Sequence, residues 1–78
     1  MNINSFSKLK KGATFIIESF KVAKDQELRL MELGILLKIK IKLLQKNNFG
    51  SSIIKCQGIK YALDNTITNQ IIATQVRS

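Results

Sequence analysis

The hydrophobic pattern changes period at Gly34, and this change constrains the fold more than any other feature of the sequence. Before it, residues 25–33 place leucines and a methionine at helical spacing, with Asp25 as a typical N-cap and Gly34 as a typical C-terminal residue. After it, residues 38–43 alternate lysine with apolar residues, which is the pattern of a strand with one buried face. So short a helix is not stable alone in water, so the sequence predicts a helix that packs on a sheet.

Four further segments are typical of short strands, because they are rich in β-branched and aromatic residues and are bounded by turn residues. They are residues 13–20, 52–57, 60–63 and 71–76. With the alternating segment they predict five strands, and the helix lies between the first and the second. For the last segment the pattern does not decide which face is buried. Either Ile71 and Ala73 face the core, or Ile72, Thr74 and Val76 do.

The connections between these segments are short. Residues 6–12 predict a single helical or 3₁₀ turn that ends at Gly12, and residues 47–50 and 64–66 predict turns, with Phe49 near the surface. A closed or nearly closed barrel is the economical way to hide strand edges in so small a chain. The expected fold is therefore mainly β, a five-stranded antiparallel barrel of SH3-like or OB-like type with one short α-helix between strands 1 and 2.

The length of the chain, 78 residues, predicts a single domain over residues 1–78. The longest nearly continuous apolar stretch, Leu33 to Leu37, is far too short to cross a bilayer. The first six residues lack the basic segment followed by an apolar segment that marks a signal peptide. We therefore expect a cytoplasmic protein.

The residue types needed for most catalytic chemistry are missing. The chain has no histidine and one cysteine, Cys56, and its five carboxylates are scattered along the sequence. These counts argue against an internal disulfide, a zinc site, a hard-metal cage and histidine-based acid–base or nucleophilic catalysis. We expect no enzyme activity, no catalytic residue, no metal site and no cofactor, and we interpret Cys56 as a buried, unreactive residue.

The net charge is unusual. Thirteen lysines and arginines against five acidic residues give a charge of +8, which favours anionic partners. Lys38, Lys40 and Lys42 form either a solvated strand face or a docking surface for an acidic partner or nucleic acid. Four further lysines could extend that surface: Lys8, Lys10, Lys11 and Lys46. The chain has no tryptophan and no alternation of basic and aromatic residues, so it lacks the usual stacking platform for nucleic acid bases.

Four apolar residues cover more than half of the circumference of the predicted helix: Leu28, Leu30, Met31 and Leu33. Either all of them pack on the core, or the surplus apolar surface is an interaction site. We expect Leu28 and Met31 to be partly exposed, so that Met31→Asp abolishes partner binding while Leu33→Asp unfolds the domain. Arg29 and Glu32, three residues apart on the polar side, can form a weak ion pair.

The helix and its flanks also carry a family resemblance. Residues 29–35, Arg-Leu-Met-Glu-Leu-Gly-Ile, resemble the central signature of the FeoA family, the small cytosolic partners of the bacterial ferrous iron transporter FeoB. Residues 6–12 and 58–63 are similar to the opening and to the glycine-turn-strand element of that family, so the resemblance covers essentially the whole chain. The sequence departs from the family pattern at Lys11, at Leu37-Lys38 and at Asp64, where the family usually has proline, Pro-Gly and arginine.

The resemblance implies an SH3-like barrel with a non-enzymatic, regulatory role in ferrous iron uptake. It implies docking on the cytosolic GTP-binding domain of FeoB, and hence recruitment to the inner face of the cell membrane without insertion into it. The residues that we predict to contact the partner are Leu28, Arg29, Met31, Glu32, Ile35, Lys38, Lys40 and Lys42. An unpaired edge strand would also allow a weak homo-oligomer. The alternative function is a basic SH3-like or OB-like domain that binds RNA or DNA through Lys38, Lys40, Lys42 and Lys46.

Overall fold

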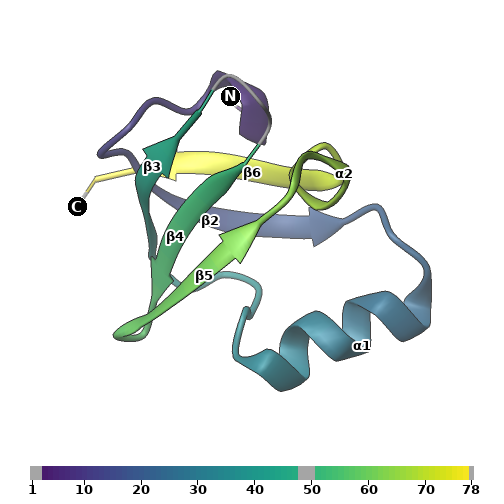
Figure 1. Cartoon of the computed structure of the whole chain (residues 1–78). Coiled ribbons are helices and arrows are strands. Elements are labelled where there is room, and N and C mark those ends of the chain that lie inside the picture. Colours follow the sequence, from purple (N-terminus) through teal and green to yellow (C-terminus); the bar gives the residue numbers. More distant parts are fainter. Residues whose placement is uncertain (1–2, 48–50, 78) are drawn as a thin grey trace.

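The structure, a computed structural model, describes residues 3–47 and 51–77, and Phe49 with most of its expected turn lies outside these ranges. One sheet and one main helix make up the fold (Figure 1). In chain order the elements are β1 (Ile3–Ser5), the 3₁₀ turn η1 (Phe6–Lys8), β2 (Thr14–Phe20), α1 (Lys24–Leu33), β3 (Ile41–Lys46), β4 (Ser52–Cys56), β5 (Ile59–Leu63), α2 (Asn65–Thr68) and β6 (Ile71–Val76).

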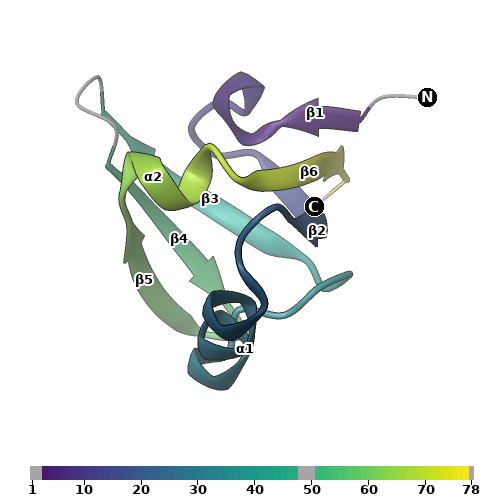
Figure 2. The ribbon, with the colours of Figure 1, turned by 90° about the vertical axis from the view of Figure 1, so that its right-hand side faces the viewer.

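The sheet has six strands in the order β1-β6-β2-β3-β4-β5, and every neighbouring pair is antiparallel. The predicted class is confirmed: the fold is mainly β, and α1 lies between the first two predicted strands, β2 and β3. Two details differ from the prediction. A sixth strand, β1, pairs with β6, and the sheet is not closed, because β1 and β5 remain its two edges in the described residues. The strongly curved sheet and α1 beyond its end are visible in Figure 2.

The inner face of the curved sheet holds the core. Phe15 and Ile17 of β2, Leu43 of β3 and Ile54 of β4 are all completely buried. The predicted burial of Cys56 is confirmed, and its Sγ lies 3.3 Å from the carbonyl oxygen of Gly34. Burial also settles the face that the sequence left open, because Ile71 and Ala73 of β6 point inward. The core includes the predicted turn at residues 6–9, where Phe6 packs edge-on against Phe15 with ring centres 5.5 Å apart.

The alternating segment forms a strand only in part. β3 begins at Ile41, three residues later than predicted, because Lys38 has a left-handed backbone with φ 65°. The N–H of Lys38 donates to the carbonyl oxygen of Ile17 at 3.0 Å, which fixes residues 38–40 as a loop beside β2. Lys38 and Lys40 are exposed as predicted, but they lie in this loop and not on a strand face.

Of the predicted helix ends, only the N-terminal end of α1 differs from the prediction. The N-cap of α1 is Ala23, with no side-chain cap, and Asp25 lies in the first turn, where its charge favours the helix dipole. Gly34 ends the helix as predicted, with φ 108°. The turn at residues 64–66 continues into α2, because Asp64 accepts a hydrogen bond from the N–H of Ile67 at 3.0 Å.

Candidate functional site

The outer side of α1 carries the most exposed leucines of the described chain. Leu30 is buried, but 54% of Leu28 and 57% of Leu33 are exposed. Met31 is half-buried and packs against the core. The expectation that Leu28 and Met31 are partly exposed is confirmed, whereas the expectation that Leu33 is a core residue is wrong, because Leu33 lies at the surface.

Helix geometry describes where Met31 and Leu33 lie relative to the buried Leu30. Leu30 points most directly at the sheet, and each residue turns the side chain by about 100°, so Met31 and Leu33 lie on opposite flanks of Leu30. The sequence defines the width of the apolar arc but not which flank meets the sheet. Leu28 and Leu33 are about 140° apart around the helix, and the polar residues Arg29 and Glu32 lie between them.

A groove of about 450 Å³ separates α1 from α2. Its lining residues are Ala23, Asp25, Gln26, Arg29, Leu30, Leu33 and Ile67. Leu33 and Ile67 supply apolar walls from the two helices, while Asp25 and Arg29 place opposite charges at its border. The contribution of Ile67 was missed by the sequence analysis, although Asp64 in a turn is a recognisable signal for a helix start at α2.

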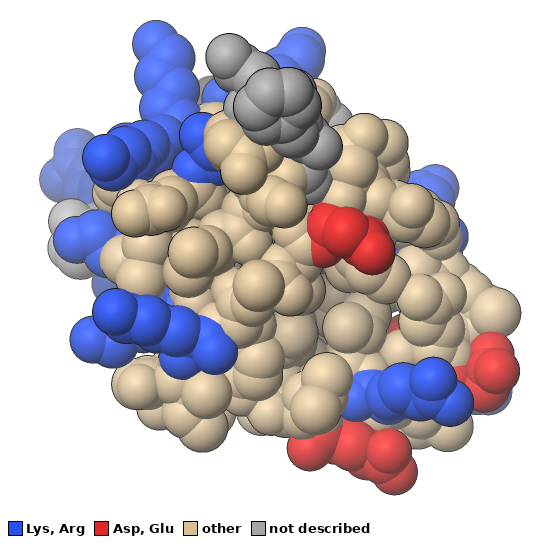
Figure 3. Space-filling model, in the orientation of Figure 1, with Lys and Arg blue, Asp and Glu red and all other residues tan. Residues whose placement is uncertain are grey.

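The charges around α1 differ from those on the rest of the surface. Three of the five carboxylates, Asp25, Glu27 and Glu32, belong to this helix. Figure 3 shows acidic side chains mainly on the right, over the helices, and basic side chains mainly on the left. Arg29 and Glu32 are exposed and, within the described ranges, form no ion pair with each other, so both can meet a partner's charges.

A close contact holds the C-terminal end of α1 against β5. The Tyr61 hydroxyl donates a hydrogen bond to the carbonyl oxygen of Leu33. A Cβ atom at Gly34 would lie 2.6 Å from that hydroxyl oxygen, so only glycine fits there without displacing Tyr61. The next residue, Ile35, is 1% exposed and belongs to the core. We therefore remove Ile35 from the predicted contact residues.

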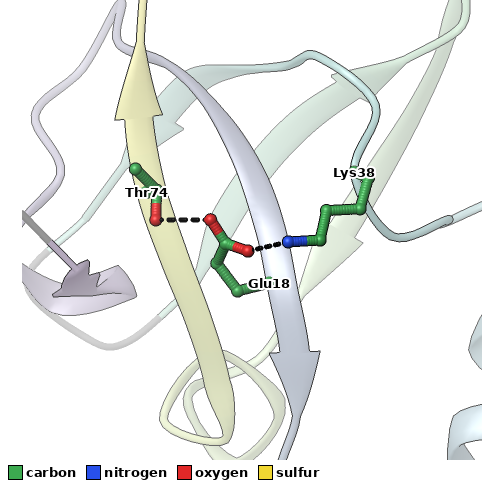
Figure 4. A network of polar contacts seen from close by, with 3 residues as sticks. All are labelled: Glu18, Lys38 and Thr74. Atoms are coloured by element: carbon green, nitrogen blue, oxygen red, sulfur yellow. Dashed lines mark hydrogen bonds and ion pairs between the residues drawn. The ribbon is translucent and has the colours of Figure 1, made fainter.

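A polar network holds the loop that follows α1. Glu18 of β2 accepts hydrogen bonds from the ammonium of Lys38 and, at 2.9 Å, from the hydroxyl of Thr74 on β6 (Figure 4). These two bonds lower the pKa of Glu18 below its ordinary value of 4.5, and the charge of Lys38 adds to the effect. Glu18 lies where the β2–β6 register shifts, and such an irregularity redirects a side chain.

The lysines of the alternating segment therefore do not form one row. Lys38 is paired with Glu18, and Lys46 donates to the carbonyl oxygens of Ser7 and Leu9, the latter at 2.9 Å. Lys42 alone of the three predicted contact lysines lies on a strand, and Lys40 is exposed in the loop before it.

No group of three or more cysteine or acidic side chains in residues 3–47 and 51–77 is arranged to hold a metal ion. Among the same residues, none of the helices has the length and apolar character to span a membrane. Two surface features described above are candidates for binding: the exposed side of α1, with its groove, and the basic side chains of the sheet.

Solved structures share this architecture over nearly the whole chain. A crystal structure of the iron uptake regulatory protein FeoA superposes with a TM-score of 0.82 at 16% identity, covering 97% of this chain and all of that one. The solution structure of the FeoA protein from Chlorobium tepidum gives 0.82 at 23% identity, covering 95% of this chain and 71% of that one. A manganese-dependent transcriptional repressor also gives 0.82, at 18% identity, and there the match covers 95% of this chain but 42% of the repressor.

At these identities the structural likeness shows a common fold, and none of the curated proteins matches the sequence. The assignment comes from the family model of the FeoA domain, which matches residues 5–75. That range includes every element from η1 to α2 and all but the last residue of β6. The resemblance carried by residues 29–35 is confirmed, and this chain belongs to the FeoA domain family.

Proposed function

We propose that the domain is a regulatory binding module that docks on the cytosolic GTP-binding domain of a FeoB-like transporter through the outer side of α1. Membership of the FeoA family supports a role in ferrous iron uptake, and this family is not an enzyme family. The proposal places the domain in the cytoplasm, where it acts by contact and not by catalysis. We define the docking side as Leu28, Arg29, Glu32 and Leu33 together with the α1–α2 groove.

The exposure of Leu28 and Leu33 is the observation that carries the proposal. Each is more than half exposed, although Leu30 of the same helix is almost fully buried. Burying a leucine side chain completely is worth roughly 1.5–3 kcal/mol, so covering both leucines would supply substantial binding energy. A partner that covers them also removes water from Arg29 and Glu32. Charges of opposite sign on the partner would offset the free-energy cost of that desolvation.

This arrangement specifies the complementary surface. It should present two apolar pockets on either side of a polar strip, because Leu28 and Leu33 lie on opposite flanks of Arg29 and Glu32. The groove beside Leu33 is large enough to admit a side chain or a short segment of the partner. Binding that depends on apolar burial should respond weakly to salt, whereas the alternative function, nucleic acid binding, should weaken steeply as salt rises.

The test is calorimetric titration of the domain with the isolated GTP-binding domain of the transporter. Leu33→Asp and Leu28→Asp should each weaken binding at least about tenfold, because a desolvated charge replaces an apolar contact. The matched control is Ile59→Asp, which introduces the same charge at an equally exposed residue on β5, 56% exposed. Thermal unfolding of all three variants checks that the fold is intact.

Unchanged affinity in both helix variants would refute the docking side. An equal loss in Ile59→Asp would show that the apolar contact is not specific to α1. A complex that forms with duplex or single-stranded oligonucleotides and dissolves in salt, without binding to the GTP-binding domain, would favour the alternative function.

A further inference from the structure

Three lysines lie side by side across β3, β4 and β5. Lys42 is the cross-strand partner of Lys55, and Lys55 is in turn the partner of Lys60. Directly opposed residues of antiparallel strands share a face, and all three side chains are exposed. The neighbours of Lys42 and Lys55 along their strands are buried, so the lysines point away from the core. We call these three residues the lysine row.

No carboxylate neutralises the lysine row within the described ranges. Glu18 is bound to Lys38 and Thr74, Asp64 caps α2, and the other three acidic residues belong to α1. The residues outside the described ranges carry no Asp or Glu. Like charges that are directly opposed destabilise a sheet, so the sequence keeps this positive strip at a cost in stability.

The lysine row and α1 lie on different sides of β5. Lys60 and Tyr61 are adjacent in the strand and therefore point to opposite faces, and Tyr61 contacts the end of α1 through the carbonyl oxygen of Leu33. The outer face around the row also carries Ile53 and Ala62, which are cross-strand partners. The domain can therefore present the row while the outer side of α1 is occupied.

We propose that the lysine row binds the anionic lipid surface of a membrane. The choice of a lipid surface rests in part on the proposed function, which brings the domain to a membrane protein. The row itself favours lipid over nucleic acid, because the one aromatic residue of β3, β4 and β5, Tyr61, points to the opposite face and offers no stacking platform. Lysines on a broad sheet face suit the diffuse charge of headgroups, which demands no fixed hydrogen-bond geometry.

The experiment is flotation of the full chain with vesicles of equal parts phosphatidylcholine and phosphatidylglycerol, and with vesicles of phosphatidylcholine alone. The wild type should bind the anionic vesicles only, and salt should release it. Replacing the row with glutamine (K42Q, K55Q and K60Q together) should weaken binding by about 100-fold, at roughly fivefold per lysine. The arginine counterpart (K42R, K55R and K60R) should bind as the wild type does, because it keeps the charges.

The matched control replaces three exposed lysines outside the row (K8Q, K21Q and K24Q), which lowers the net charge equally. An equal loss in this control would overturn the proposal, since net charge alone would then explain binding. Wild-type binding in the glutamine variant would overturn it, as would tighter binding to an oligonucleotide that depends on the row. The vesicles contain no transporter, so failure here leaves docking through α1 untouched, and failed docking leaves lipid binding untouched.

Discussion

The outer side of α1 and the lysine row show two ways in which a small domain can present a binding surface. On α1, two leucines remain exposed beside charges of both signs, so the docking that we propose there would depend on apolar burial and on the shape of the partner. On β3, β4 and β5, three like charges lie in register, so the lipid binding that we propose there would depend on charge and act at longer range. The two surfaces should therefore respond differently to substitution and to salt.

The largest expected effect concerns the two sides of α1, the buried side at Leu30 and the exposed side at Leu33. Leu30→Ala should destabilise the domain by about 2–4 kcal/mol, because it opens a cavity against the sheet. Leu33→Ala, the same chemical change at an exposed residue, should cost less than about 1 kcal/mol. Urea unfolding measures both, and similar costs would mean that Leu33 is a core residue after all.

The second test separates α1 from the sheet. Gly34→Ala should destabilise the domain by about 2 kcal/mol, because the left-handed backbone strains any other residue and the new methyl group meets the Tyr61 hydroxyl. Adding Tyr61→Phe to this variant removes the clashing oxygen and should recover part of the loss. If Tyr61→Phe costs the same in both backgrounds, the close approach of these two residues has no energetic weight.

The third test probes the repulsion within the lysine row. Lys55→Gln removes the central charge and should stabilise the domain by about 0.5 kcal/mol at low salt, because it relieves two opposed pairs. The gain should shrink in concentrated salt, where the charges are screened. Lys21→Gln, an exposed lysine outside the row, serves as the control, and an equal gain there would attribute the effect to net charge.

The smallest expected effect is on the pH dependence of stability, and it is confined to acid pH. It concerns the network of Glu18, Lys38 and Thr74 that holds the loop after α1. The native pKa of Glu18 is lowered, so the unfolded chain binds its proton more readily. The stabilisation is therefore complete above the ordinary pKa of 4.5 and is lost as the pH falls through the lower native pKa. Glu18→Gln should make the thermal unfolding temperature less dependent on pH over this range, and the wild-type dependence persisting in this variant would contradict the role of Glu18.

Local chemistry made much of this fold predictable. Gly34 marks both the end of α1 and the change from helix to strand, and alternation gave the inward faces of Ile54, Cys56, Tyr61 and Leu63. β1 was not predictable, because its three residues carry no strand pattern and their partner, β6, lies about 70 residues further along the chain. The late start of β3 was not predictable either, because lysine seldom adopts the left-handed backbone found at Lys38.

The candidate site was less predictable than the fold. Arg29 and Glu32 were assigned to the polar side from spacing alone, and both are exposed. The exposure of Leu33 depends on the direction from which α1 meets the sheet, which a helical pattern does not contain. The lysine row depends on the register between strands, and no feature of the sequence aligns Lys42, Lys55 and Lys60 before that register is known.

The position of β6 has a consequence for biosynthesis. This strand is the last of the domain, yet it lies between β1 and β2 and bonds to both. While the ribosome is still making the earlier strands, β1 has no partner and β2 is paired on one side only. The sheet therefore stays incomplete until residues 71–76 emerge from the exit tunnel, and β1 can join it only after β6 is in place.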